Sequence, residues 1–137
     1  MKRKGIFNQT GVIFVACLFI LIFSQEANAA NQYILDGASG TYATTKCDSW
    51  EINRACDDLP TSLVRGDTYY VADGNYARHI FNDEESGSTY ITIKKATTND
   101  HGTDTGWQSS YGDGQATFAV VAASGYETGL KFRKGYY

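Results

Sequence analysis

The chain has 137 residues, a hydrophobic fraction of 42% and a formal net charge of −3. This length is enough for one domain, and the acidic balance argues against a nucleic acid or an anionic membrane surface as the partner. Ten Tyr and two Trp stand beside a single Pro. Together with the many Thr and Gly residues, they are typical of a β-rich protein.

Residues 1–29 have the layout of a secretory signal peptide. A basic segment at residues 2–4 precedes an apolar run of 12 residues, 12–23, and Ala27-Asn28-Ala29 supplies the small residues that signal peptidase accepts. The run is shorter than the roughly 18–20 residues that span a bilayer, so a retained membrane anchor is the less favoured alternative.

Removal of this segment lowers the basic count from 12 to 9 and the acidic count from 15 to 14, which gives a net charge of −5. We therefore expect a protein that is secreted or at the cell surface, with the periplasm also open. No nucleic-acid partner is expected, and no membrane partner once the signal peptide is removed.

Two interpretations of residues 47–64 compete. A capping box formed by Asp48 and Glu51, followed by apolar residues on one face, favours a helix. Alternatively, Cys47 and Cys56, the two cysteines left after signal removal, form a disulfide in an oxidising compartment. A disulfide needs Cα atoms within roughly 7 Å, whereas nine residues of helix would separate them by about 13 Å. We favour the disulfide; two buried free thiols are the remaining alternative.

Short strand-like runs separated by turn signals occupy most of the remaining chain. Strands are predicted at residues 32–36, 68–72, 77–81, 89–95, 115–122 and 129–134, and a helical turn at residues 57–64. Asp73-Gly74 is predicted to form a turn. Residues 96–114 are predicted to form a long loop, and loops of this length are usually functional or disordered. Ile91 and Ile93 lie on the same side of their strand and are expected to face a core.

The most specific pattern lies in residues 65–95. It contains a Gly-Asp-Thr-Tyr-Tyr-Val strand, an Asp-Gly-Asn-Tyr turn and the run Ser-Gly-Ser-Thr-Tyr-Ile-Thr-Ile-Lys. In these features the chain resembles the opening coil of secreted bacterial right-handed parallel β-helix proteins, the pectate-lyase-like superfamily. The strand at residues 33–36 and the Cys- and Trp-containing segment before residue 65 also resemble the N-terminal cap of that group, so that the resemblance covers about residues 32–137.

The resemblance implies an all-β fold, a right-handed parallel β-helix. It divides the chain into the signal peptide at 1–29, an N-terminal cap with a strand and a short helical turn at 30–64, and about three coils at 65–137. Spacings of 21 residues from Tyr70 to Ile91 and 27 from Ile91 to Phe118 fit the periods of repeat folds. A small antiparallel β-sandwich is the alternative.

A coil stack needs a cap at each end. The final run GLKFRKGYY offers none, so the sequence is expected to be a truncated piece of a longer β-helix.

Side chains that could carry chemistry are few. Four basic residues could lie on one outer strand face: Arg78, His79, Lys94 and Lys95. The simpler interpretation is that they belong to solvated strand faces. Three loop aspartates, Asp100, Asp104 and Asp113, could bind Ca²⁺, but their spacing fits neither an EF-hand nor a nonapeptide repeat. No other cofactor is expected.

Two further features have a functional and a structural interpretation. Trp107 and Tyr111 could stack on sugar rings, or they could fold the long loop onto the coil, which we favour. Arg65-Gly66-Asp67 spells a cell-adhesion tripeptide, but a glycine turn before the next strand is the simpler interpretation.

The resemblance implies a secreted protein that acts on or binds polysaccharide or cell-surface glycan. It could be a polysaccharide lyase or a glycoside hydrolase whose active site lies in coils beyond Tyr137. The alternative is a non-catalytic β-helix for surface adhesion or glycan binding. A lyase needs a base and a positive group beside the uronate carboxylate, and no residue of this sequence can be assigned to either role.

Overall fold

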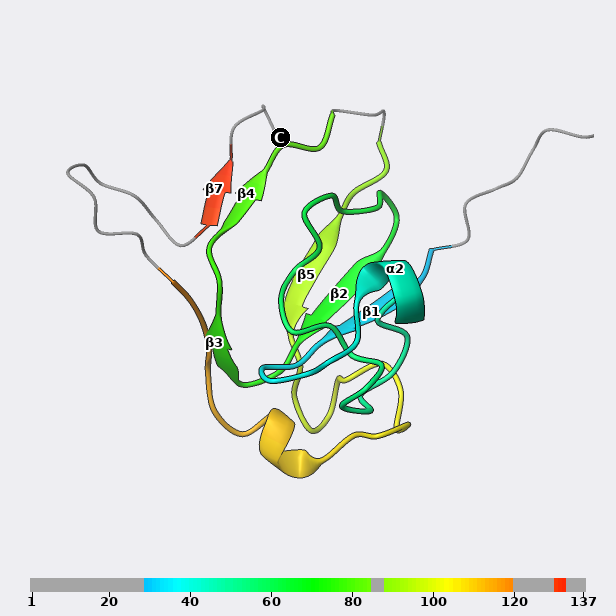
Figure 1. The fold of residues 1–137 in the computed structure, drawn as a ribbon, viewed down its shortest axis with the longest axis vertical. Coiled ribbons are helices and arrows are strands. Elements are labelled where there is room, and N and C mark those ends of the chain that lie inside the picture. Colours follow the sequence, from blue (N-terminus) through cyan, green and yellow to red (C-terminus); the bar gives the residue numbers. More distant parts are fainter. Residues whose placement is uncertain (1–28, 85–87, 120–129, 133–137) are drawn as a thin grey trace, which may run out of the picture.

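A computed structural model describes residues 29–84, 88–119 and 130–132 of the chain (Figure 1). The signal-peptide prediction lies outside the described residues except for Ala29, as do parts of the strands predicted at 115–122 and 129–134. The elements are β1 (Asn31–Ile34), the one-turn helix α2 (Tyr42–Thr45), β2 (Thr68–Val71), β3 (Gly74–Tyr76), β4 (His79–Phe81), β5 (Thr92–Lys95), the 3-10 turn η1 (Ser109–Tyr111), β6 (Ala116–Phe118) and β7 (Leu130–Phe132). The expected predominance of strands over helix is confirmed.

The strands form three parallel sheets. β1, β2 and β5 lie side by side, β3 pairs with β6, and β4 pairs with β7 (Figure 1). Every strand pair that the structure describes is parallel, so these strands do not adopt the pairing of the antiparallel sandwich. The chain runs through β2, β3 and β4 and then through β5, β6 and β7, and each strand of the second round lies beside its counterpart in the first.

The register corrects both predicted repeat spacings. Tyr70 lies opposite Lys94, not opposite Ile91. Phe118 lies opposite Tyr76, not opposite Ile91, and Ile93 lies opposite Tyr69. The spacings from Tyr70 to Ile91 and from Ile91 to Phe118 were wrong as repeat periods, because Ile91 precedes β5 and is the register partner of neither residue. The long loop separates β5 from β6 in the second round, whereas only Ala72 and Asp73 separate β2 from β3 in the first.

Two apolar clusters cover opposite faces of the sheet β1-β2-β5. The inner cluster contains Ile34, Tyr69, Val71, Tyr76 and Phe81 together with both cysteines and two leucines, and Ile91, Ile93 and Phe118 pack against it. This confirms that the two isoleucines face a core. The outer cluster contains Tyr33, Leu35, Trp50, Ala55, Tyr70, Ala72 and Ala96, with Trp107 and Tyr111 packed against it. Successive strand residues therefore serve alternate cores, as a sheet buried on both faces requires.

The disulfide between Cys47 and Cys56 is present, with the Cα atoms 5.1 Å apart. The segment that it closes covers the free edge of β1. Tyr33 donates its N–H to the Cys47 carbonyl at 2.7 Å and accepts from the Cys56 N–H at 3.0 Å, and Leu35 donates to the Cys56 carbonyl at 2.8 Å. An uncovered strand edge invites unwanted pairing, so this segment acts as a cap for the sheet.

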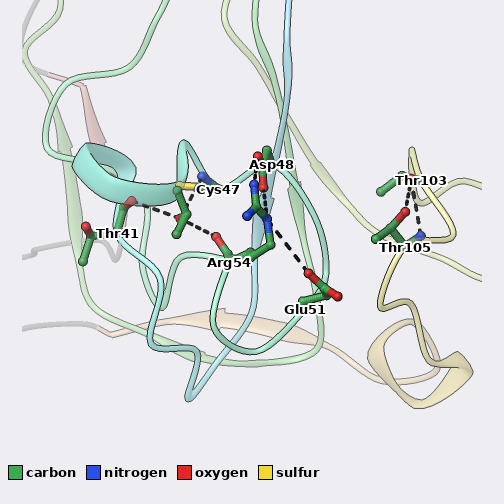
Figure 2. Close-up of polar contacts among 8 residues, drawn as sticks. Thr41, Cys47, Asp48, Glu51, Arg54, Thr103 and Thr105 are labelled. Atoms are coloured by element: carbon green, nitrogen blue, oxygen red, sulfur yellow. Dashed lines mark hydrogen bonds and ion pairs between the residues drawn. The ribbon is translucent and has the colours of Figure 1, made fainter.

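The helix prediction was wrong for both of its positions. Within residues 47–64, all of which the structure describes, there is no helix, and the one-turn helix α2 precedes Cys47 instead. Asp48 and Glu51 do not form a capping box but both pair with Arg54 (Figure 2). The disulfide requires a sharply bent path, and Lys46 and Cys47 accordingly have φ values of 57° and 53°, which no helix contains.

Asp73-Gly74 was predicted as a turn, but β3 begins at Gly74. Gly74 has a φ of +149°, and a Cβ atom there would lie 2.4 Å from the Asp36 side chain of the preceding round. Only glycine fits this close approach.

Candidate functional site

The outer face of the sheet β1-β2-β5 carries a column of aligned side chains. Tyr33, Tyr70 and Lys94 occupy the same register position on the three strands. The rings of Tyr33 and Tyr70 stack with centroids 5.8 Å apart, and the Lys94 ammonium lies 4.5 Å from the centroid of the Tyr70 ring. The column ends in a cation–π contact, which is favourable at partly exposed sites.

The long loop folds back over this face and is held by aromatic contacts. Trp50 is fully buried and donates from Nε1 to the His101 carbonyl at 2.8 Å. Trp107 lies against it with ring centroids 5.0 Å apart. The His101 ring stacks on Trp107 at 4.2 Å, with an interplanar angle of 10°, and Tyr111 meets Trp107 edge-on at 5.9 Å. Trp107 and Tyr111 therefore fold the loop onto the sheet, as we favoured.

Two glycines permit the close approach of the loop. Gly102 and Gly106 have φ values of +76° and +74°, where side chains are strained. A Cβ atom on Gly102 would lie 2.7 Å from the Tyr33 hydroxyl, and one on Gly106 would lie 2.4 Å from the Glu51 nitrogen. The path of the loop is thus determined by its sequence.

Polar side chains line the exposed border of this loop. Lys94 Nζ lies 2.8 Å from Asp100 Oδ2, and His101 Nε2 lies 2.8 Å from Asp104 Oδ1. The Asp104 side chain is 99% exposed. The hydrogen bond between Lys94 and Asp100 raises the pKa of the lysine and lowers that of the carboxyl. We call these four residues, Lys94, Asp100, His101 and Asp104, the loop rim; they are the candidate functional site.

The four basic residues proposed to share an outer face do not share one. Lys94 lies on the outer side of β5, whereas Lys95 forms an ion pair with Asp73 at the inner register position of Ile34 and Val71. His79 is only 5% exposed, its Nε2 has no hydrogen-bond partner in the part of the chain that the structure describes, and burial lowers its pKa. Arg78 is half-buried. Strand alternation separates the lysines, and burial removes the histidine from the surface.

The three aspartates considered for Ca²⁺ do not form one cluster. Asp100 pairs with Lys94 and Asp104 with His101, and Asp113 lies near Asp73. Within residues 29–84, 88–119 and 130–132, no group of three or more His, Cys, Asp or Glu side chains is arranged to hold a metal ion.

Arg65-Gly66-Asp67 is a turn, as we expected. Gly66 has a φ of +93°, and Asp67 is only 3% exposed. The Asp67 carboxylate accepts from the Ala30 N–H at 2.8 Å and from Gln32 Nε2 at 3.0 Å. A tripeptide whose acidic group is buried in this way presents no surface for adhesion.

Sequence analysis missed the role of the aspartates that follow the strands. Asp36 Oδ2 accepts from the Asn75 N–H at 2.8 Å, and Asp73 Oδ2 accepts in the same way from the Gly114 N–H. Each carboxylate thus binds the backbone of the next round. The signal was present as Tyr-Ile-Leu-Asp-Gly at residues 33–37 and Tyr-Val-Ala-Asp-Gly at 70–74, because these segments are offset by the 37 residues that separate Ala30 from Asp67 in the same register.

Other aspartates join separate segments by the same type of contact. Asp57 accepts from the Gly37 N–H at 2.6 Å, Asp58 from the Ala77 N–H at 2.6 Å and Asp83 from the Leu63 N–H at 3.0 Å. Much of the acidic composition is therefore used to satisfy loop backbone.

The chain matches no protein-family model, no curated protein and no solved structure. In the part of the chain that the structure describes, every helix is too short or too polar to cross a bilayer.

Proposed function

We propose that the chain is built as a right-handed parallel β-helix and that it belongs to a secreted protein that binds polysaccharide or cell-surface glycan. The fold proposal is supported by the order of the parallel pairs, in which β2, β3 and β4 meet β5, β6 and β7 one after the other. Stacked rounds of this kind are typical of solenoids. Secretion is supported by the signal-peptide pattern of the sequence and is compatible with the disulfide.

The loop rim is the observation that carries the binding proposal. It brings the Asp100 and Asp104 carboxylates and the His101 imidazole of the long loop beside the Lys94 ammonium of β5, and the buried aromatic residues beneath hold the loop against the sheet. Glycan recognition depends on hydrogen bonds between sugar hydroxyls and polar groups of fixed orientation. Loops held by a rigid scaffold are where such groups are usually found.

Binding fits these residues better than catalysis does. Proton abstraction needs a base that can reach the substrate. Lys94 and Lys95 are each paired with a carboxylate, and His79 is buried. The lyase or hydrolase alternative is therefore supported by the family resemblance and not by the arrangement of these three residues.

The charge of the rim indicates the class of glycan. Lys94 is paired with Asp100, and His101 with Asp104, so the rim offers no excess of positive charge to a polyanion. The mature chain is itself expected to be acidic. We therefore expect a neutral, hydroxyl-rich polysaccharide to bind more tightly than a polyuronate.

The test is binding of the full secreted protein to immobilised neutral polysaccharides and polyuronates. Asp104→Ala removes the most exposed carboxylate and should weaken binding about tenfold, since a hydrogen bond to a charged group contributes about 1.5 kcal/mol. Gln108→Ala, an exposed position of the same loop, is the matched control and should bind normally.

Failure to bind any polysaccharide, or equal binding by the Asp104 variant and the control, would contradict the proposal. Ultraviolet absorbance of unsaturated product from a polyuronate would instead establish the lyase alternative.

A further inference from the structure

The backbone of Ala30 is held at a buried carboxylate. Its N–H donates to Asp67 Oδ1 at 2.8 Å, and its carbonyl accepts from the Thr68 N–H at 2.9 Å. Asp67 is only 3% exposed, and its second oxygen accepts from Gln32 Nε2 at 3.0 Å. Both donors to this carboxylate are uncharged, although a buried carboxylate is costly without a positive partner.

Ala30 is also the residue that follows the signal-peptidase pattern Ala27-Asn28-Ala29. Ala29 and Ala30 are exposed, so the bond between them is accessible. Hydrolysis of that bond by signal peptidase consumes one water and leaves a carboxylate on Ala29 and an amine on Ala30. The amine takes up a proton at neutral pH. The group facing Asp67 thereby changes from a neutral amide N–H to an ammonium.

We propose that cleavage after Ala29 completes the fold, because the new α-ammonium of Ala30 forms an ion pair with the buried carboxylate of Asp67. The inference rests on the secretion part of the proposed function and is independent of glycan binding. It assigns a processing site and a reason for its position: cleavage one residue earlier or later would move the charge away from Asp67.

A second observation in the same cluster favours an additional donor. Gln32 Oε1 is buried and has no hydrogen-bond partner among the described residues, while Gln32 Nε2 is already bound to Asp67. An ammonium brings three N–H groups where the uncleaved amide has one. A buried acceptor without a donor costs stability, so a cluster that holds such an acceptor gains from additional N–H groups.

The ion pair gives the processed protein a defined pH dependence. The titratable groups of the cluster are the amine, Asp67 and the Tyr69 hydroxyl, which senses Asp67 and whose pKa burial raises to about 12. An amine beside a carboxylate has a raised folded-state pKa. Its stabilisation is therefore complete below the unfolded value of about 8 and is lost as the pH rises through the higher folded value.

The experiment compares the full chain, secreted and processed by the host, with a variant that carries one inserted Ser between Ala29 and Ala30. Intact mass first establishes where each mature chain begins. The insertion moves the amine by one residue and leaves a neutral N–H at Ala30. We expect the protein that begins at Ala30 to melt about 5 °C higher at pH 6.5, and the difference to vanish at strongly alkaline pH.

Asp67→Asn, introduced into the parent protein and into the insertion variant, completes a double-mutant cycle. In proteins that carry Asp67→Asn, the insertion should have no effect on the melting temperature. If the Asp67→Asn variant fails to fold, the pH dependence of the two proteins that retain Asp67 decides. Equal melting temperatures of these two proteins at pH 6.5, or a mature chain that begins elsewhere than Ala30, would overturn the proposal. Neither result depends on whether the protein binds glycan.

Discussion

Among the described residues, β1 and β5 are the two outer strands of the sheet β1-β2-β5, and they differ in how they are finished. The edge of β1 is covered by the disulfide-closed segment from Cys47 to Cys56, which takes up its backbone groups. Ile34 on β1 and Val71 on β2 occupy the same inner register position, and Lys95 occupies this position on β5. Lys95 forms an ion pair with Asp73. The edge of β1 is closed by the disulfide and by backbone hydrogen bonds, whereas β5 carries the charged Lys95 where β1 and β2 carry aliphatic side chains.

This difference shows where the stability of the described fold is concentrated. The residues of β1 and β2 that face either cluster are buried, whereas Ile93 and Lys95 on β5 are only half-buried. An inward charge on a strand discourages indiscriminate edge pairing. Substitutions near the cap should therefore cost more than equivalent substitutions on β5.

The largest effect is expected from Trp50, which is fully buried and joins the cap to the long loop. Trp50→Ala should lower the free energy of unfolding by about 4 kcal/mol, since it leaves a large cavity. Trp107→Ala, at a half-buried position of the same cluster, should cost about half as much. Urea unfolding followed by circular dichroism measures both, and equal losses would contradict the concentration of stability at the cap.

The disulfide should contribute about as much as one buried side chain. Replacing Cys47 and Cys56 by Ala opens a loop with a sequence separation of 9, and the chain-entropy relation gives a loss of about 3 kcal/mol. Reduction of the unmodified protein in denaturant should give a similar loss. A double variant as stable as the parent would show that the cap does not depend on the cross-link.

A pair of isoleucines compares the strands directly. Ile34 is fully buried on β1, and Ile93 is half-buried on β5. Ile34→Ala should cost about 3.5 kcal/mol and Ile93→Ala about 1.5 kcal/mol, because less apolar surface returns to water at the second position. The two thermal unfolding curves give the difference, which should be about 2 kcal/mol; a reversed order would contradict the comparison.

The smallest effect concerns the ion pair beneath β5. Burial acts to raise the pKa of Asp73, but hydrogen bonds from Lys95 and from the Gly114 N–H outweigh burial and lower it. The stabilisation is therefore present above the unfolded value of about 4 and is lost as the pH falls through the lower folded value. Asp73→Asn should lower the free energy of unfolding by about 1 kcal/mol at pH 7. It should also make the free energy of unfolding less dependent on pH in the acidic range.

The double variant Asp73→Asn with Lys95→Met provides the control. Both changes remove the same ion pair. The double variant should therefore lose less stability than the sum of the losses of the two single variants. Full additivity would show that the pair contributes nothing.

Local patterns in the sequence predicted the cross-link and the described strands other than β3, which begins within the predicted turn Asp73-Gly74. Alternation of Ile91 and Ile93 indicated a strand with one buried side, and the even cysteine count indicated a disulfide. Asp48 and Glu51 also form a local pattern, but it predicted a helix that is absent from residues 47–64. The reason is that the disulfide requires a bent backbone, and a covalent constraint outweighs a capping preference of about 1 kcal/mol.

Features that depend on distant residues were not predicted. The register partner of Phe118 depends on the length of the long loop between β5 and β6, and the pattern of residues within a strand does not indicate that length. The binding of Asn75 by Asp36 required comparison of two turns one round apart, and the repeated Tyr-x-x-Asp-Gly segments would have indicated it. The inward position of Lys95 was visible from alternation, but its pairing with Asp73 depends on the turn of the preceding round.

The central claim is that consecutive rounds stack in parallel and in this register, and cross-linking tests it most directly. Asn75 and Thr117 are exposed register partners on β3 and β6, so Asn75→Cys with Thr117→Cys should form a disulfide on mild oxidation. Asn75→Cys with Ala119→Cys, two residues further along the exposed face, should remain reduced. A cross-link in the second pair but not in the first would contradict the parallel register and the account built on it.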